Sequence, residues 1–178
     1  LPGWVLSNPE NSTIRSQEPP ELQASFAPKN LVHSVLRTPG AFNDVDASVT
    51  VRFLEAPEGT TEAGIQTRWS TDGYYDLTFS AGGGIFLGAI RNEGGTSKYV
   101  SLLSEPEHSA ARKGLGVPNR LRVMHRDHKL RAWLNGVLLL SIEDSSFQSG
   151  LVRIVVRSEK EHRNRVAFSA LQLREALG

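Results

Sequence analysis

Asp44-Val-Asp-Ala-Ser-Val-Thr-Val-Arg-Phe53 alternates polar and apolar side chains at every step. Side chains that alternate with a period of two point to opposite faces of an extended strand. We therefore predict a half-buried strand here, with Val45 and Phe53 facing a core and Asp46 and Arg52 facing solvent. This stretch decides the fold class, because the same period recurs through the rest of the chain.

Similar apolar runs follow one another down to the end of the sequence. They are Ala63–Trp69, Tyr74–Ser80, Ile85–Arg91, Ser97–Leu102, Asn119–His125, Lys129–Asn135, Val137–Ile142, Leu151–Arg157 and Arg165–Leu173. Glycine-containing turns separate most of them, and Asn135-Gly136 in particular supplies the positive φ angles of a tight hairpin. Many short strands at this spacing predict an all-β fold, an antiparallel two-sheet β-sandwich of the jelly-roll kind.

Very little helix is expected. The candidates are a short turn at Ser109–Lys113 and the end of the chain, and neither has an apolar stripe of useful length.

Residues 1–178 are expected to form a single domain, because this length suits one core. Residues 1–40 are predicted to be irregular, since prolines interrupt every candidate strand. Short segments near Trp4–Leu6, Leu22–Phe26 and Leu31–Leu36 are nevertheless expected to supply edge or closing strands. They would pair with the last strand and cover the sheet edges.

Composition excludes several classes of function. The chain has no cysteine, which rules out disulfides, zinc-thiolate sites and thiol catalysis. A formal charge of +1 and 39% hydrophobic residues suit an ordinary globular protein, and we expect no nucleic-acid partner. The longest apolar run, Val137–Ile142, is far below the ~20 residues that span a bilayer, so no membrane insertion is expected. The start at Leu1-Pro2 suggests a processed product or an excised domain.

Phrases in the second half of the chain form a distinctive series: Asn119-Arg-Leu-Arg-Val-Met-His-Arg126, Leu130-Arg-Ala-Trp-Leu-Asn-Gly136, Ile142-Glu-Asp-Ser-Ser-Phe-Gln-Ser-Gly150 and Val166-Ala-Phe-Ser-Ala-Leu-Gln-Leu173. Upstream stands Gly64-Ile-Gln-Thr-Arg-Trp-Ser-Thr-Asp-Gly-Tyr-Tyr-Asp-Leu-Thr-Phe79. Over roughly residues 31 to 174 the series resembles bacterial concanavalin A-like or laminin G-like jelly-roll domains. These include the domain of unknown function 1080 group, also described as 3-keto-disaccharide hydrolases, and extracytoplasmic modules of bacterial receptor kinases.

The resemblance implies a fold more than a function. In such domains the ligand or active surface is usually the concave sheet and its rim, and an extracytoplasmic or secreted location is expected. Part of the group carries hydrolase activity. Fold-level similarity does not choose among these functions.

Motifs for catalysis and for metal binding are missing. His125 and His128 flank a predicted hairpin turn, which is no metal-binding helix face. The glucanase pattern Glu-x-Asp-x-x-Glu and the Gly-x-Ser-x-Gly elbow are both absent. Asp44 and Asp46 share a face, yet they start a strand on its polar side, where solvation explains them. We predict no catalytic residue, no metal and no cofactor.

A ligand surface is predicted from aromatic rings beside planar polar groups, the combination that suits sugar faces and hydroxyls. The predicted ligand-binding residues are Gln66, Arg68, Tyr74, Asp76, Arg91, Tyr99, Arg131 and Trp133. An ordinary solvated sheet face is the alternative. Trp69 shares its predicted face with Ile65 and is assigned to the core, whereas Trp133 is the stacking candidate.

Three functions stay open. The first is a non-catalytic extracytoplasmic recognition module that binds carbohydrate or a protein partner through one sheet face and its rim loops. The second is a glycan-processing hydrolase of the 3-keto-disaccharide hydrolase type, and the third is a structural or assembly domain of a larger complex. Oligomeric state does not follow from the sequence.

Overall fold

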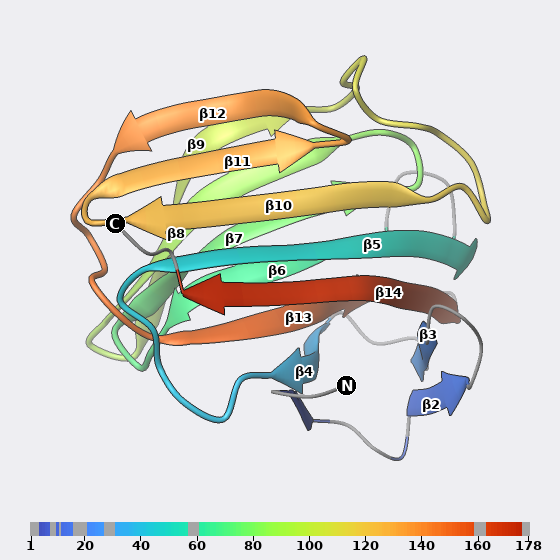
Figure 1. The fold of residues 1–178 in the computed structure, drawn as a ribbon, viewed down its shortest axis with the longest axis horizontal. Coiled ribbons are helices and arrows are strands. Elements are labelled where there is room, and N and C mark those ends of the chain that lie inside the picture. Colours follow the sequence, from blue (N-terminus) through green and yellow to red (C-terminus); the bar gives the residue numbers. More distant parts are fainter. Residues whose placement is uncertain are drawn as a thin grey trace.

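A computed structural model describes residues 4–7, 10, 12–15, 21–26, 31–56, 61–158 and 163–175. Two antiparallel sheets of seven strands each are stacked face to face (Figure 1). This is the predicted all-β sandwich with a jelly-roll fold. The alternation that starts at Asp44 is therefore a reliable guide to the architecture.

Both sheets are assembled from strands distant in sequence. In spatial order, sheet A contains β1 (Val5–Leu6), β4 (Leu31–Arg37), β13 (Leu151–Ser158), β6 (Glu62–Trp69), β7 (Gly73–Ser80), β8 (Ile85–Glu93) and β9 (Thr96–Glu105). Sheet B contains β12 (Val137–Glu143), β11 (Lys129–Leu134), β10 (Asn119–Arg126), β5 (Val45–Glu55), β14 (Asn164–Glu175), β3 (Glu21–Phe26) and β2 (Ser12–Arg15).

The core lies between the two sheets. Alternate residues of β5, including Val49 and Phe53, are at most 1% exposed, as the sequence pattern predicts. Phe53 meets Phe79 of the opposite sheet edge to face, with ring centroids 5.1 Å apart. Phe147 enters the core from the loop between β12 and β13. One continuous apolar interior therefore holds the sheets together.

The first forty residues supply strands to both sheets. β3 pairs with β14, which is the predicted pairing with the last strand. β4 extends sheet A beside β13, and β1 pairs with β4. β2 was not predicted from the sequence. Of the prolines that suggested irregularity, those before Pro39 lie outside the described residues.

Tight turns form where the sequence predicts them. Asn135 and Gly136 have φ angles of 51° and 84°, and they join β11 to β12 as an antiparallel hairpin. Asp127, with φ of 52°, turns the chain between β10 and β11. Ser109–Lys113 is a turn and loop, and β14 continues to Glu175, so neither candidate helix forms in the described residues. No helix there is long and apolar enough to cross a membrane.

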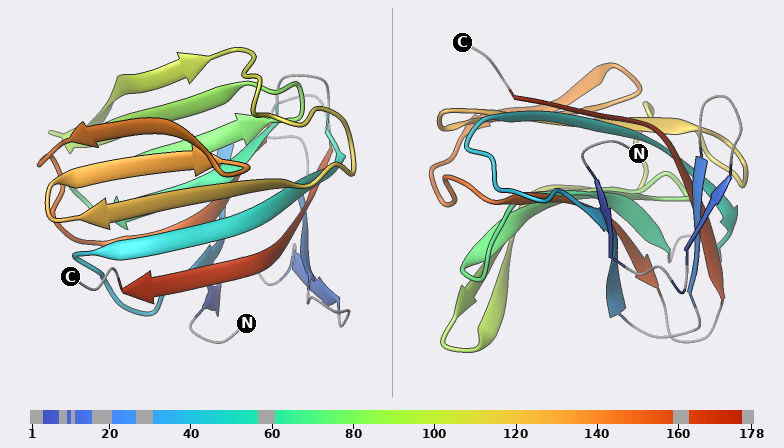
Figure 2. Two further views of the ribbon diagram at one scale, coloured as in Figure 1. Left: turned by 45° about the horizontal axis from the view of Figure 1, so that its top comes forward. Right: turned by 60° about the horizontal axis from the view of Figure 1, so that its bottom comes forward.

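Sheet A is strongly curved. The right-hand view of Figure 2 shows β8 and β9 bending away from sheet B on one side, and β1 and β4 doing so on the other. The outer face of sheet A, which points away from sheet B, is therefore the concave side of the sandwich.

Candidate functional site

The predicted ligand-binding residues are divided between opposite faces of the sandwich. Gln66, Tyr74, Asp76 and Tyr99 belong to β6, β7 and β9 and lie on the concave outer face of sheet A. The sequence pattern identified the outward side of these strands, because alternation fixes the face of each residue once the strand is known.

The other predicted residues lie elsewhere. Arg131 and Trp133 are on β11 and project from the outer face of sheet B. Arg91 lies at the end of β8, where its Nη2 donates to Ser146 Oγ at 2.7 Å in the loop after β12. One contiguous patch of all the predicted residues therefore does not form. Sequence pattern alone could not show which strands share a sheet.

Arg68 was predicted on the outward face with Gln66, and its placement differs. Its side chain is 2% exposed and turns toward the interior, because Arg68 adopts a φ of 51°. The guanidinium donates to main-chain carbonyl oxygens of Phe147 at 2.6 Å, Asp127 at 2.7 Å and Asn43 at 2.9 Å. Arg68 therefore joins three loops at one end of the sandwich and takes no place on the surface.

The same irregularity places Trp69 on the outer face of sheet A and not in the core. A residue with positive φ breaks the alternation, and the register between β6 and β13 shifts at this point. Trp69, assigned to the core from its spacing to Ile65, is only half-buried and lines the outer face. Its ring lies 4.6 Å from the guanidinium carbon of Arg153. The core assignment of Trp69 is wrong for this reason.

Neighbouring strands place planar polar groups in a row across sheet A. Arg37, Arg153, Gln66 and Asp76 are successive cross-strand partners on β4, β13, β6 and β7. Adjacent strands are about 4.8 Å apart, so the row runs across the sheet at roughly that spacing. We call these four residues the polar row.

Aromatic side chains lie beside the polar row and at its β7 end. Trp69 and Arg153 line a hollow of about 440 Å³ with Arg37, Ser34 and residues of the β1 segment. At the β7 end, Gly88 is the next partner after Asp76, and a Cβ at Gly88 would come within 2.2 Å of the Tyr99 ring. The lack of a side chain at Gly88 therefore lets Tyr99 lie over the sheet.

An ion pair joins the polar row to a neighbouring arginine, Arg157. Asp76 is 4% exposed, and its Oδ2 accepts from Arg157 Nη2 at 3.0 Å. Arg157 also approaches Glu62, with Nε to Oε2 at 3.8 Å, and Thr78 Oγ1 donates to Glu62 Oε2 at 2.8 Å. Arg157 and Glu62 were missed from the sequence, although their alternation with core neighbours places them on this face.

Two buried acceptors of the polar row have no hydrogen-bond partner among the described residues: Asp76 Oδ1 and Gln66 Oε1. An unpartnered buried acceptor costs free energy, typically about 1–3 kcal/mol. Both oxygens have almost no accessible surface, so a ligand would contact the more exposed groups beside them, which are Trp69, Arg153 and Tyr99.

Burial raises the pKa of Asp76 to about 6. Arg157 and the Gln66 amide oppose this shift by favouring the carboxylate, whereas Glu62 adds to it. The pKa of Tyr74 is also raised, first by burial and then by Asp76, while Arg153 and Arg157 lower it. Tyr74 therefore belongs to the same electrostatic environment as the polar row.

The pKa of Asp76 predicts an unusual pH dependence. A carboxyl whose folded pKa lies above its unfolded value binds more protons when folded, so its ionisation destabilises the fold as pH rises from about 4 to 6. Replacing Asp76 with Asn removes this loss. As pH rises over this interval, we expect the unfolding free energy of Asp76→Asn to increase relative to that of the wild type by on the order of 3 kcal/mol.

Urea denaturation at several pH values measures this difference. Asp72→Asn, an exposed carboxylate in the turn before β7, is the matched control and should track the wild type. A constant difference between Asp76→Asn and the wild type at all pH values would contradict the raised pKa.

Metal ligation has no support on this face. The described residues contain no group of three or more His, Asp or Glu side chains placed to hold an ion. The chemistry available is therefore hydrogen bonding by planar amide, carboxylate and guanidinium groups, together with stacking on Trp69 and Tyr99.

Comparison with solved structures finds proteins that share this fold. No family model matches the chain, and no curated protein does so. Among solved structures, carbohydrate binding module CBM66 from Bacillus subtilis is 11% identical, with 97% of this chain and 96% of that chain covered and a TM-score of 0.61. The GH43 BlXynB protein from Bacillus licheniformis is 16% identical, with a TM-score of 0.66.

Coverage differs between these structures. The match to BlXynB spans 97% of this chain but 37% of that one. A functionally unknown protein from Saccharomyces cerevisiae is 17% identical, with coverages of 98% and 96% and a TM-score of 0.62. At such identities the shared property is the fold. The resemblance to the domain of unknown function 1080 group stays a prediction.

Proposed function

We propose that this chain is a carbohydrate recognition module that binds a glycan across the concave face of sheet A and performs no reaction on it. The single observation that carries the proposal is the polar row flanked by the accessible rings of Trp69 and Tyr99. Sugar rings stack on aromatic faces while their hydroxyls fill hydrogen bonds to planar polar groups. The row supplies both kinds of contact.

The similarity of fold to CBM66 supports this proposal. That protein is named a carbohydrate binding module, and the match extends over nearly all of both chains. We propose further that the chain acts outside the cytoplasm or as a secreted protein. The support for this location is its resemblance to extracytoplasmic bacterial modules.

Hydrolysis is the second candidate function, because Asp76 and Glu62 converge on Arg157 and the pKa of Asp76 is raised to about 6. A pair of carboxylates, one with a raised pKa, is what glycoside hydrolysis requires. Two features favour binding. Arg157 ion-pairs with both carboxylates, and Asp76 is too deeply buried to reach a glycosidic oxygen.

Trp69→Ala tests the proposed site. We expect wild-type protein to retain at least one neutral oligosaccharide on a glycan array, and Trp69→Ala to bind it about tenfold more weakly, since a stacked ring contributes on the order of 1 kcal/mol beyond its buried area. Isothermal titration with the retained oligosaccharide measures the affinity. Thermal unfolding of each variant verifies that it folds.

Trp133→Ala is the matched control, because Trp133 lies on the opposite face of the sandwich. Equal losses in both tryptophan variants, or a loss in Trp133→Ala alone, would place the ligand elsewhere. Incubating the bound oligosaccharide with wild type and with Glu62→Gln distinguishes the hydrolase. Cleavage by the wild type that is abolished in Glu62→Gln would replace the binding proposal with a catalytic one.

A further inference from the structure

The outer face of sheet B carries more cations than carboxylates and takes no part in the proposed site on sheet A. Alternation along β10, β11 and β14 places one kind of side chain on this face repeatedly. Its cations are Arg120, Arg122, Arg126, Lys129, Arg131 and Arg174. We call these six residues the basic face.

Four carboxylates lie among or beside these cations: Asp46, Asp127, Glu143 and Glu175. Asp46 on β5 receives two bonds from Arg122, Nε to Oδ1 at 2.8 Å and Nη2 to Oδ2 at 2.7 Å. Asp46 in turn raises the pKa of Arg122 through this contact. Because a bidentate pair of this kind uses both oxygens, Asp46 is not available to neutralise the other cations.

None of the other three carboxylates forms an ion pair with the remaining cations within the described residues. Arg120 Nη2 donates to neutral acceptors, Ser48 Oγ at 2.7 Å and Gln172 Oε1 at 2.8 Å. The rest form no ion pair and no side-chain hydrogen bond within the described part of the chain: Arg126, Lys129, Arg131 and Arg174. Charge that stays unpaired on one face attracts anions from solution.

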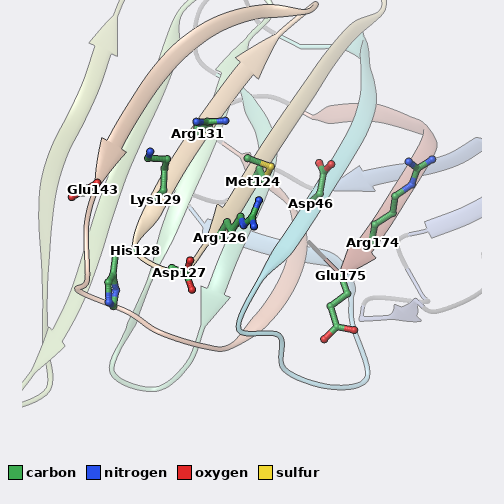
Figure 3. A pocket seen from close by; sticks show the side chains of 10 residues that line it. All are labelled: Asp46, Met124, Arg126, Asp127, His128, Lys129, Arg131, Glu143, Arg174 and Glu175. Atoms are coloured by element: carbon green, nitrogen blue, oxygen red, sulfur yellow. The ribbon is translucent and has the colours of Figure 1, made fainter. Parts of the chain in front are cut away.

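These free cations surround a hollow. Lys129, Arg131, Arg126 and Arg174 stand around Met124 and Asp46 in Figure 3, whereas Glu143 and Glu175 lie toward its margins. The hollow measures about 630 Å³, and a second one of about 230 Å³ adjoins it through Asp46 and Arg174. Together they are large enough for several linked sugar residues.

Apolar side chains also lie on the basic face. Met124 lies half-buried at the centre of the hollow, and Arg122 covers the Trp133 ring at 4.7 Å from its centroid. The predicted stacking residue Trp133 and the predicted ligand residue Arg131 both belong to this region. A ligand that carries anionic groups on an otherwise amphipathic backbone would match both features.

We propose that the basic face binds an acidic polysaccharide, one that carries a carboxylate on each or most of its sugars. Guanidinium groups recognise planar carboxylates through paired hydrogen bonds. The carboxylates near the hollow, Asp46, Asp127 and Glu143, can accept from sugar hydroxyls. Every nucleotide of a nucleic acid carries a phosphate, which these carboxylates would repel. The face therefore suits a nucleic acid less well than an acidic polysaccharide.

Polygalacturonate is the probe for this proposal, with a neutral polysaccharide as comparison. We expect the full chain to be retarded by polygalacturonate in affinity electrophoresis, and the retardation to weaken as sodium chloride rises from about 50 mM to about 300 mM. The double variant Arg131→Gln/Arg174→Gln should bind at least about tenfold more weakly, because it removes two of the unpaired cations. Its thermal unfolding should match the wild type.

Arg153→Gln is the matched control, since it removes a cation from the opposite face. It should keep full affinity for polygalacturonate while losing affinity for neutral oligosaccharides, so the two sites can fail separately. No retardation at low salt, or equal retardation of the double variant, overturns the proposal. Equally tight binding of single-stranded DNA or of vesicles rich in anionic lipid would overturn it as well, because the face would then select charge alone.

Discussion

Acidification from about pH 6.5 to about pH 4 is expected to destabilise the fold through His125. Its ring is 1% exposed, and burial followed by the charge of Arg68 lowers its pKa to about 3, against the opposing effect of Asp144. The unfolded chain takes up this proton near pH 6.5 and the folded chain does not. The contribution to stability is complete above that pH, and on the order of 3 kcal/mol of it is lost by about pH 4.

The surroundings of His125 explain why it stays neutral. Nε2 lies 2.7 Å from Thr67 Oγ1, the ring packs against Tyr75 at 4.9 Å, and Nδ1 has no partner among the described residues. A proton on Nδ1 would bring an unpaired charge into the core, which is costly.

Urea denaturation of the wild type and of His125→Gln measures this effect. Glutamine keeps a polar contact for Thr67 and cannot be protonated in this range, so the variant should lose less stability on acidification. The unfolding free energies of the two proteins are subtracted at each pH, because Asp76 changes the stability of both in the opposite direction between about pH 4 and pH 6. Parallel pH profiles for the two proteins would show that His125 does not titrate as its burial implies.

Loss of Arg68 is expected to have a similarly large effect on stability. Arg68→Met removes the donors to the carbonyls of Asn43, Asp127 and Phe147, which belong to three different loops. Each buried acceptor left unpaired costs about 1–3 kcal/mol. We expect a loss of about 3–5 kcal/mol and a fall in Tm of roughly 10 °C for a domain of this size.

Differential scanning calorimetry provides the test for Arg68. Arg112→Met removes an exposed arginine from the loop before β10 and should change Tm little. A Tm in Arg68→Met equal to that of the Arg112 control would mean that the loops hold their positions without the guanidinium.

Strand positions and turns could be predicted because they follow from local rules. Asn135-Gly136 forms its hairpin through positive φ at both residues, and Val45 to Phe53 face the core in alternation. Such features depend on nearby residues alone.

The wrong predictions for β6 arose because one residue broke the alternation of inward and outward side chains. Arg68 is not a glycine, so nothing in the sequence signals its positive φ, and this conformation reverses the faces of Arg68 and Trp69. The division of the predicted ligand residues between two faces has another cause. Sheet membership depends on which distant strands pair, as β13 does with β6, and alternation within one strand carries no such information.

The two outer faces differ in what they offer a ligand. The concave face of sheet A combines buried acceptors and paired charges with Trp69 and Tyr99, whereas the basic face of sheet B presents unpaired cations. A neutral glycan suits the first and an acidic one the second. One small domain would thereby hold two chemically distinct polymers, provided that each face binds independently.

The most direct test of the central claim is an amide NMR titration of isotope-labelled protein with the neutral oligosaccharide that gives the strongest array signal. Binding at the concave face predicts shift changes concentrated in β4, β6, β7 and β13, together with the Trp69 indole resonance, while the strands of sheet B stay unchanged. Shift changes centred on β10 and β11, or none at saturating oligosaccharide, would contradict it.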